Sequence, residues 1–193
     1  MTAAVAVLVV CTANQCRSVL GAAIVRRALA DAGIRAQVRS AGTHALDGIE
    51  ATPETVQAAR RLGLDVTNHR SRRIDDALVA RADLICCMER FHVVEIGSVW
   101  PEAMDRTFTL KDLARRAGES HRHPAEPVEH WLARIGSDRR PADLLGSAED
   151  DDVADPTGRA VRHHRRTAQE IAAAVDLVVA GLNGPLHHEA RLA

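Results

Sequence analysis

The chain has 193 residues, carries a formal net charge of −1 and is 46% hydrophobic. This length favours one domain with a buried core, and the balanced charge argues against a protein that binds nucleic acid or a membrane surface through bulk charge. The first ten residues lack a basic region, and their apolar run is too short to span a bilayer, so we expect no signal peptide and a cytoplasmic protein. Four cysteines in such a protein are more typical of reduced or catalytic thiols than of structural disulfides.

Apolar, strand-like runs alternate with helix-like segments along the chain. Strands are predicted at residues 4–10, 36–40, 82–88 and 107–110, and helices at residues 19–32, 53–62, 74–80, 90–96, 111–116 and 157–182. The first and third strand candidates are continuously apolar, as expected for strands that are covered on both faces. The alternation predicts an α/β three-layer sandwich in which a four-stranded parallel sheet lies between two helical layers.

One segment interrupts this alternation. Residues 118–154 are rich in proline, histidine and acidic residues, and we interpret them as a surface loop that contains one short helix through Trp131. The sequence therefore predicts a single domain over residues 1–183 with a loop insert at about 118–154, followed by a mobile tail over residues 184–193.

The stretch CTANQCRS, residues 11–18, lies between the first strand and the first long helix. In open parallel sheets ligands bind beyond the carboxyl ends of the strands, and loop amides that lead into a helix bind anions. Such surroundings favour the thiolate form of Cys11, while Arg17 can bind two phosphate oxygens and Ser18 can donate its hydroxyl to the thiolate. The stretch therefore predicts a loop that binds a tetrahedral oxyanion and attacks it. The alternative is an ordinary strand-to-helix turn with small buried cysteines.

An attack on a phosphate ester also requires an acid that protonates the leaving oxygen. Asp155 is a candidate because Pro156 holds it in an extended or turn conformation ahead of the last predicted helix. The alternative is that Asp155 is only the N-cap of that helix, within an acidic loop exposed to solvent.

Several motifs resemble those of the low-molecular-weight protein tyrosine phosphatase family, and they occur along this chain in the family's order. The family's C-x-G-N-x-C-R-S loop matches residues 11–18, and its S-A-G-T stretch matches residues 40–43. Its D-L-I-x-x-M strand matches residues 83–88, and its late Asp-Pro pair matches residues 155–156. The histidine that follows the family's second helix matches His69.

The resemblance implies hydrolysis of a phosphate monoester through a phosphocysteine intermediate, without a metal or another cofactor. It implies that Cys11 is the nucleophile, that Arg17 clamps the phosphate and that Asp155 acts first as acid and then as base. It also implies a phosphate-binding loop with its support, formed by Thr12, Ala13, Asn14, Gln15, Cys16, Ser18, Ser40 and His69. Cys16 matches a second loop cysteine that can form a reversible disulfide with Cys11, although a small buried side chain is an equally good interpretation.

Departures from the family pattern concern the loop and the substrate. Ala13 replaces the loop glycine, which requires a negative φ at that position. Thr157 stands where the family has a tyrosine, and Leu46 lies near the place of a second aromatic residue; in the family these aromatic rings flank a phosphotyrosine ring. Gln15 occupies a variable position that is apolar in tyrosine-type members and threonine in phosphoarginine-type members. The predicted partner is therefore a phosphotyrosine protein, a phosphoarginine protein or a small-molecule phosphate.

Two other functions fit parts of the sequence. Thioredoxin-coupled arsenate reductases resemble this fold and loop, but they need further cysteines to relay a disulfide. Only Cys86 and Cys87 are available here, and adjacent cysteines are poor disulfide partners. A non-catalytic phosphate-binding module is the third interpretation, and it predicts no turnover of any aryl phosphate.

Overall fold

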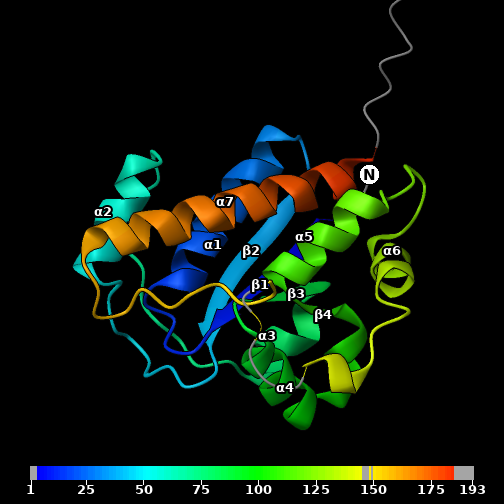
Figure 1. Ribbon diagram of the computed structural model, residues 1–193, viewed down its shortest axis with the longest axis horizontal. Helices are drawn as coiled ribbons and strands as arrows, with labels where there is room; N and C mark the ends of the chain where they lie inside the picture. Colours follow the sequence, from blue (N-terminus) through cyan, green and yellow to red (C-terminus); the bar gives the residue numbers. More distant parts are fainter. Residues whose placement is uncertain (1–3, 145–147, 149, 185–193) are drawn as a thin grey trace, which may run out of the picture.

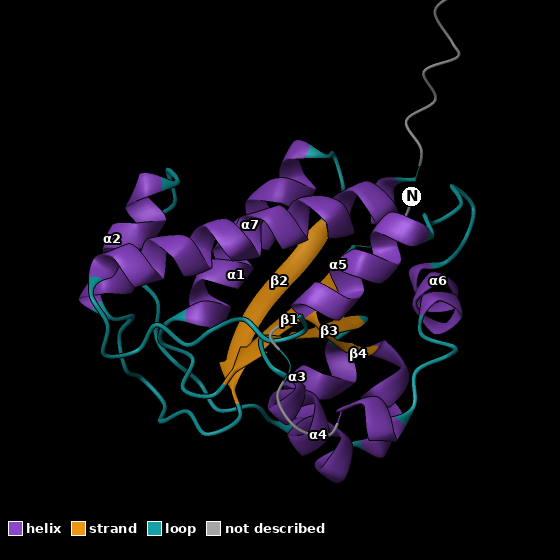
Figure 2. Cartoon of the chain, in the orientation of Figure 1, coloured by secondary structure: helices purple, strands orange, loops and turns teal. Residues whose placement is uncertain are grey.

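Four parallel strands form the centre of the molecule (Figure 2). A computed structural model of the chain describes residues 4–144, 148 and 150–184. The strands are β1 (Val5–Cys11), β2 (Ala36–Gly42), β3 (Leu84–Cys87) and β4 (Thr107–Thr109). Their order in the sheet is β2-β1-β3-β4, and all three neighbouring pairs are parallel. The predicted four-stranded parallel sheet is confirmed.

Helices cover both faces of this sheet (Figure 1). They are α1 (Arg17–Asp31), α2 (Pro53–Arg61), α3 (Asp76–Arg81), α4 (Arg90–Val99), α5 (Leu110–Glu119), α6 (Val128–Ile135) and α7 (Val161–Asn183), with 3-10 helices η1 (Pro101–Arg106) and η2 (Pro141–Leu144). Alternate side chains of β1 enter different cores: Val7 and Val9 pack with α1, α5 and α7, whereas Leu8 and Val10 pack with α3 and α4. The predicted three-layer α/β sandwich is therefore confirmed.

Local signals fix the ends of the second helix. The Thr52 side chain accepts a hydrogen bond from the backbone N–H of Thr55. Pro53 occupies the first helical position, where the sequence predicts the helix to begin. Gly63 follows the helix with a positive φ of 69°, a conformation that favours glycine.

The start of α7 differs from the prediction of a helix that begins at residue 157. The backbone N–H of Arg159 donates to the carbonyl of Pro156 at 2.9 Å, and Gly158 has a φ of 73°, so these residues form a turn. The helix begins at Val161, and Ala160 occupies its N-cap position. The alternative role of Asp155 as the helix cap is therefore wrong.

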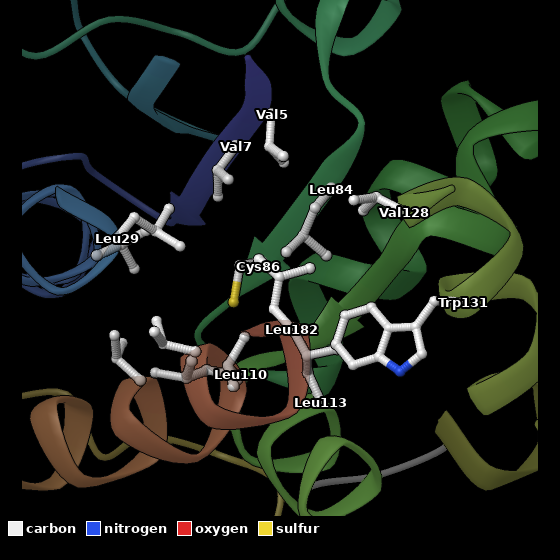
Figure 3. Close-up of a pocket in the computed structure, with 14 residues that line it drawn as sticks. Val5, Val7, Leu29, Leu84, Cys86, Leu110, Leu113, Val128, Trp131 and Leu182 are labelled. Atoms are coloured by element: carbon white, nitrogen blue, oxygen red, sulfur yellow. The ribbon is translucent and has the colours of Figure 1, made fainter. Parts of the chain in front are cut away.

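The short helix predicted through Trp131 is confirmed as α6, but the interpretation of the whole 118–154 segment as a surface loop is wrong. The Trp131 side chain is fully buried, and its indole N–H donates to the carbonyl of Ser120 at 2.8 Å. With Leu113 of α5, Leu182 of α7 and Cys86 of β3 it lines an apolar cavity of about 20 Å³ (Figure 3). The segment thus completes one face of the core. Residues 185–193 of the tail that the sequence predicts to be mobile lie outside the described residues.

Candidate active site

The loop of residues 12–16 begins at the carboxyl end of β1 and leads into α1. Cys11 lies at its base with only 3% of its surface exposed, and its Sγ atom is 2.9 Å from Ser18 Oγ. Ser18 Oγ also accepts a hydrogen bond from Asn14 Nδ2 at 2.9 Å. Since its lone pairs receive the Asn14 N–H, the Ser18 hydroxyl can direct its own hydrogen to the sulfur and stabilise a thiolate.

Asn14 holds the loop in an unusual backbone conformation. Its φ is 54°, the only positive value at a non-glycine residue in the described part of the chain. Asparagine tolerates this region better than most residues, and both polar ends of its side chain are hydrogen-bonded here. Its Oδ1 accepts from the backbone N–H of Arg72 at 3.0 Å, and its carbonyl accepts from His69 Nε2 at 2.7 Å. Ala13 avoids the positive φ region, so a side chain replaces the family's glycine without strain.

The two residues predicted to support the loop differ in their contacts. His69 reaches the loop through its bond to Asn14, and burial lowers the pKa of its imidazole, which favours the neutral ring. Ser40 is buried in β2 opposite Val9 of β1. Its hydroxyl makes no hydrogen bond to the loop among the residues that the structure describes, so its supporting role stays a prediction.

Arg17 connects the loop to two carboxylates from distant parts of the chain. Its guanidinium is 2% exposed, and it contacts Glu89 Oε1 at 2.5 Å through Nη1 and Asp155 Oδ2 at 2.9 Å through Nη2. Nη1 also donates to the carbonyl of Val153 at 3.0 Å. The segment that precedes α7 therefore lies against the loop of residues 12–16 and the start of α1, at the edge of the sheet where β1 ends (Figure 1).

The Asp155 carboxylate faces both Arg17 and solvent. Burial opposes its ionisation, but hydrogen bonds from the Thr157 backbone and hydroxyl, together with the Arg17 charge, outweigh burial and hold its pKa below the ordinary value of 3.8. The side chain is still 43% exposed. Asp155 is therefore an ion-paired carboxylate that a substrate could reach.

Glu89 and His92 belong to the site, but the sequence analysis missed them. Both follow β3, which pairs with β1, so the rule that places ligands at strand ends could have identified them. The Nδ1 atom of His92 accepts from the backbone N–H of Glu89 at 3.1 Å, and its Nε2 atom lies 2.9 Å from Thr12 Oγ1. Because Nδ1 is the acceptor, Nε2 carries the hydrogen and donates to Thr12. Burial, aided by the Arg17 charge, lowers the pKa of His92 to about 3.

The Thr157 side chain lies beside the loop of residues 12–16. Its hydroxyl lies 3.7 Å from Cys16 Sγ, and Cys16 Sγ also lies 3.6 Å from Thr52 Oγ1. Leu46, in the loop after β2, is 74% exposed. Thr157 therefore occupies the place of the family's tyrosine without supplying an aromatic ring.

The other two cysteines are unsuited to a disulfide relay. Cys86 and Cys87 are fully buried in β3, and burial raises the pKa of Cys86 to about 12 and that of Cys87 also well above its ordinary value. Thiols held protonated in this way are poor nucleophiles, which argues against arsenate reductase chemistry. Within the described ranges, no cluster of three or more acidic, histidine or cysteine side chains could hold a metal ion. No helix in those ranges is long and apolar enough to cross a membrane.

Comparisons with known proteins agree with the sheet and the loop. Residues 6–133 match the family model described as low molecular weight phosphotyrosine protein phosphatase. The chain is 36% identical over 107 residues to the "Probable low molecular weight protein-tyrosine-phosphatase EpsP" of Ralstonia nicotianae, which covers 55% of this chain and 71% of that protein. It is 34% identical over 106 residues to a protein-arginine-phosphatase of Bacillus subtilis, covering 55% of this chain and 70% of the relative.

A solved structure extends the likeness to nearly the whole chain. The crystal structure of a low molecular weight protein tyrosine phosphatase from T. tengcongensis superposes with a TM-score of 0.70 at 25% identity, over 91% of this chain and 98% of the other. The match to the family model ends at residue 133, so the position of Asp155 is supported by the geometry described above rather than by that model.

Proposed function

The chain belongs to the low molecular weight phosphotyrosine protein phosphatase family and is a cysteine-dependent phosphatase; from this premise we propose that Cys11, Arg17 and Asp155 carry out its chemistry. One observation supports the assignment most strongly. The Arg17–Asp155 ion pair joins the loop that holds Cys11 to a segment 138 residues later in the chain. The three residues to which we assign the roles of nucleophile, clamp and acid thus lie together where β1 ends.

In the first step the Cys11 thiolate attacks phosphorus, forming a P–S bond as the P–O bond to the leaving group breaks. Asp155 in its acid form gives its proton to the leaving oxygen. In the second step the Asp155 carboxylate takes a proton from a water molecule, which attacks phosphorus and breaks the P–S bond. Phosphate and the Cys11 thiolate are released, and Asp155 is again protonated. Arg17 and the loop amides stabilise the equatorial oxygens throughout.

Substrate binding favours the protonated form of Asp155, which takes its proton from solvent. Without substrate the Arg17 guanidinium favours ionised Asp155. A phosphate dianion that binds Arg17 neutralises this charge and places negative charge beside the carboxylate, and both effects raise the affinity of Asp155 for a proton. Glu89 remains as a second carboxylate on Arg17 and keeps the guanidinium oriented across the loop.

The test of this assignment is the variant Asp155→Asn with two substrates. Asparagine keeps the acceptor for Thr157 but cannot donate a proton, so kcat/KM for an alkyl phosphate should fall by about 10²–10⁴-fold. A nitrophenyl phosphate has a good leaving group and should lose much less. Because kcat/KM ends at formation of the phosphocysteine, the later water step does not obscure the comparison. An equal loss on both substrates would contradict the role of Asp155 as the acid.

Stability provides the control for this variant. Asp155 does not cap α7, and its pair with Arg17 is partly exposed, so Asp155→Asn should change the free energy of unfolding by less than about 1 kcal/mol. A larger change would mean that the residue is mainly structural.

The substrate class is a phosphate monoester or the related phosphoryl group of a modified protein side chain. Two proteins similar to this chain are named for phosphotyrosine and protein arginine phosphatase activity. We propose a phosphorylated protein as the substrate, with turnover of matched phosphotyrosine and phosphoarginine peptides as the measurement that separates the two side chains. A cytoplasmic location would keep the Cys11 thiol reduced.

A further inference from the structure

An open groove lies beside the proposed acid. It has a volume of about 670 Å³ and runs between the Asp155 segment, the first turns of α7 and α5. Asp155 and Pro156 form one wall, while His163 and Arg166 of α7 form part of the other. We call this groove the α7 groove. Asp155 lines the groove and also pairs with Arg17 beside the phosphate-binding loop, so a peptide that lies in the groove can extend into that loop.

The three carboxylates of the α7 groove are already bound. Asp152 accepts hydrogen bonds from the backbone N–H groups of Arg90 at 2.7 Å and Ala148 at 3.0 Å. Asp155 pairs with Arg17 as described, and Glu170 lies 2.8 Å from Lys111 Nζ. Two of the three carboxylates are therefore paired with a cation, whereas Asp152 keeps its charge among backbone N–H groups.

Two arginines of the α7 groove have no such compensation. Arg159 and Arg166 line it and are exposed. Neither guanidinium has an ion pair or a hydrogen bond within the part of the chain that the structure describes, although Arg17, Arg90 and Arg134 all pair with carboxylates there. Among the described residues, two unpaired guanidinium groups against the one carboxylate without a cationic partner, Asp152, leave the unbalanced charge of the lining residues positive.

The sequence of α7 adds positive charge where a helix least tolerates it. The helix starts with VRHHRR, and its first turn contains no acidic residue and no side-chain cap. A cation in the first turn of a helix interacts unfavourably with the helix dipole, so Arg162 does not stabilise α7 through that dipole. Residues that weaken a helix are expected where they serve a function at the protein surface.

We propose that the α7 groove docks an acidic segment of a phosphorylated protein, next to the residue whose phosphate enters the loop. This inference rests on the proposed function and narrows its substrate class. Arg159 and Arg166 pair with aspartate or glutamate side chains of the segment. One exposed ion pair changes affinity by roughly twofold to fivefold. The ion pairs of Arg159 and Arg166 together therefore contribute about tenfold at low ionic strength, and less as salt is added.

The test compares two phosphopeptides that differ only in whether three flanking residues are acidic or neutral amides. The measured quantity is the ratio of kcat/KM for the acidic peptide to that for the neutral peptide, since effects on the chemical step cancel in this ratio. The ratio for wild type should be about ten at low salt. In the Arg159→Gln/Arg166→Gln variant the ratio should fall to within about twofold of one, because KM for the acidic peptide rises. The control is Arg81→Gln, because Arg81 ends α3 ahead of β3, at the opposite edge of the sheet, and it should keep the wild-type ratio.

A wild-type ratio near one, or a wild-type ratio that persists in the double variant, overturns the proposal. If neither peptide is turned over, the proposed function fails, and fluorescence anisotropy of the two labelled peptides on Cys11→Ser protein still tests the groove by the same ratio. A third outcome is that the two peptides bind alike, while turnover of an aryl phosphate with an extra carboxylate falls in the Arg159→Gln/Arg166→Gln variant. The occupant of the groove is then a small anionic molecule, and the proposal is wrong.

Discussion

Replacement of His92 should remove an acid-sensitive part of the stability of this fold. The imidazole is fully buried, accepts from the Glu89 backbone and donates to Thr12. Protonation of Nδ1 would destroy the bond from Glu89 and bury a cation close to Arg17. The pKa is accordingly about 3 in the folded protein, against an ordinary value of 6.5.

The sign and size of the effect follow from proton linkage. A histidine whose pKa is lowered by folding contributes stability that is complete above the unfolded pKa of 6.5 and is lost as the pH falls toward the folded pKa of about 3. One pH unit within this window is worth about 1.4 kcal/mol. Between about pH 7.5 and about pH 5 the contribution of His92 should therefore fall by about 2 kcal/mol.

The assay is urea unfolding of wild type and His92→Gln at these two pH values. Glutamine at this position of a helix can accept from the Glu89 N–H and donate to Thr12, but it does not titrate. His69 and His164, whose pKa values burial also lowers, are common to both proteins and cancel in the comparison. His130→Gln, at an exposed position of α6, is the matched control and should behave as wild type. If wild type and His92→Gln lose the same stability on acidification, the argument from burial is wrong.

Two further changes test the core and the loop. Trp131→Phe should lower the free energy of unfolding by about 1–3 kcal/mol, because the carbonyl of Ser120 loses its buried donor and the cavity beside the ring grows; unchanged urea unfolding would contradict this. Mild peroxide should inactivate the enzyme and a thiol reductant should restore it, with a Cys11–Cys16 disulfide visible by mass spectrometry; both cysteines are free in the structure, and direct oxidation of Cys11 to sulfinic acid would exclude a protective role for Cys16.

The parts of the fold that sequence reasoning predicted depend on local signals. Continuous apolar runs identify β1 and β3, and the Thr52-Pro53 pair identifies the start of α2. The loop between Cys11 and Arg17 was predictable because the strand, the loop and the helix that build it are consecutive in the chain.

The parts that sequence reasoning missed depend on distant contacts or on one turn. Arg17 meets Glu89 across 72 residues, and Thr12 meets His92 across 80, and no local pattern reports such packing. The turn at Gly158 places the start of α7 at Val161 instead of the predicted residue 157. The polar composition around Trp131 hides an apolar helix face that becomes evident only when α5 and α7 are in place.

The most direct test of the account is detection of the phosphocysteine itself. Asp155→Asn mixed rapidly with nitrophenyl phosphate should release about one equivalent of nitrophenol in a burst, because the thiolate still attacks while the water step lacks its base. After an alkaline denaturing quench and digestion, mass spectrometry should find one phosphoryl group on Cys11, and Cys11→Ser should show neither the burst nor turnover. A phosphoryl group on another residue, or turnover within tenfold of wild type by Cys11→Ser, would contradict the central claim.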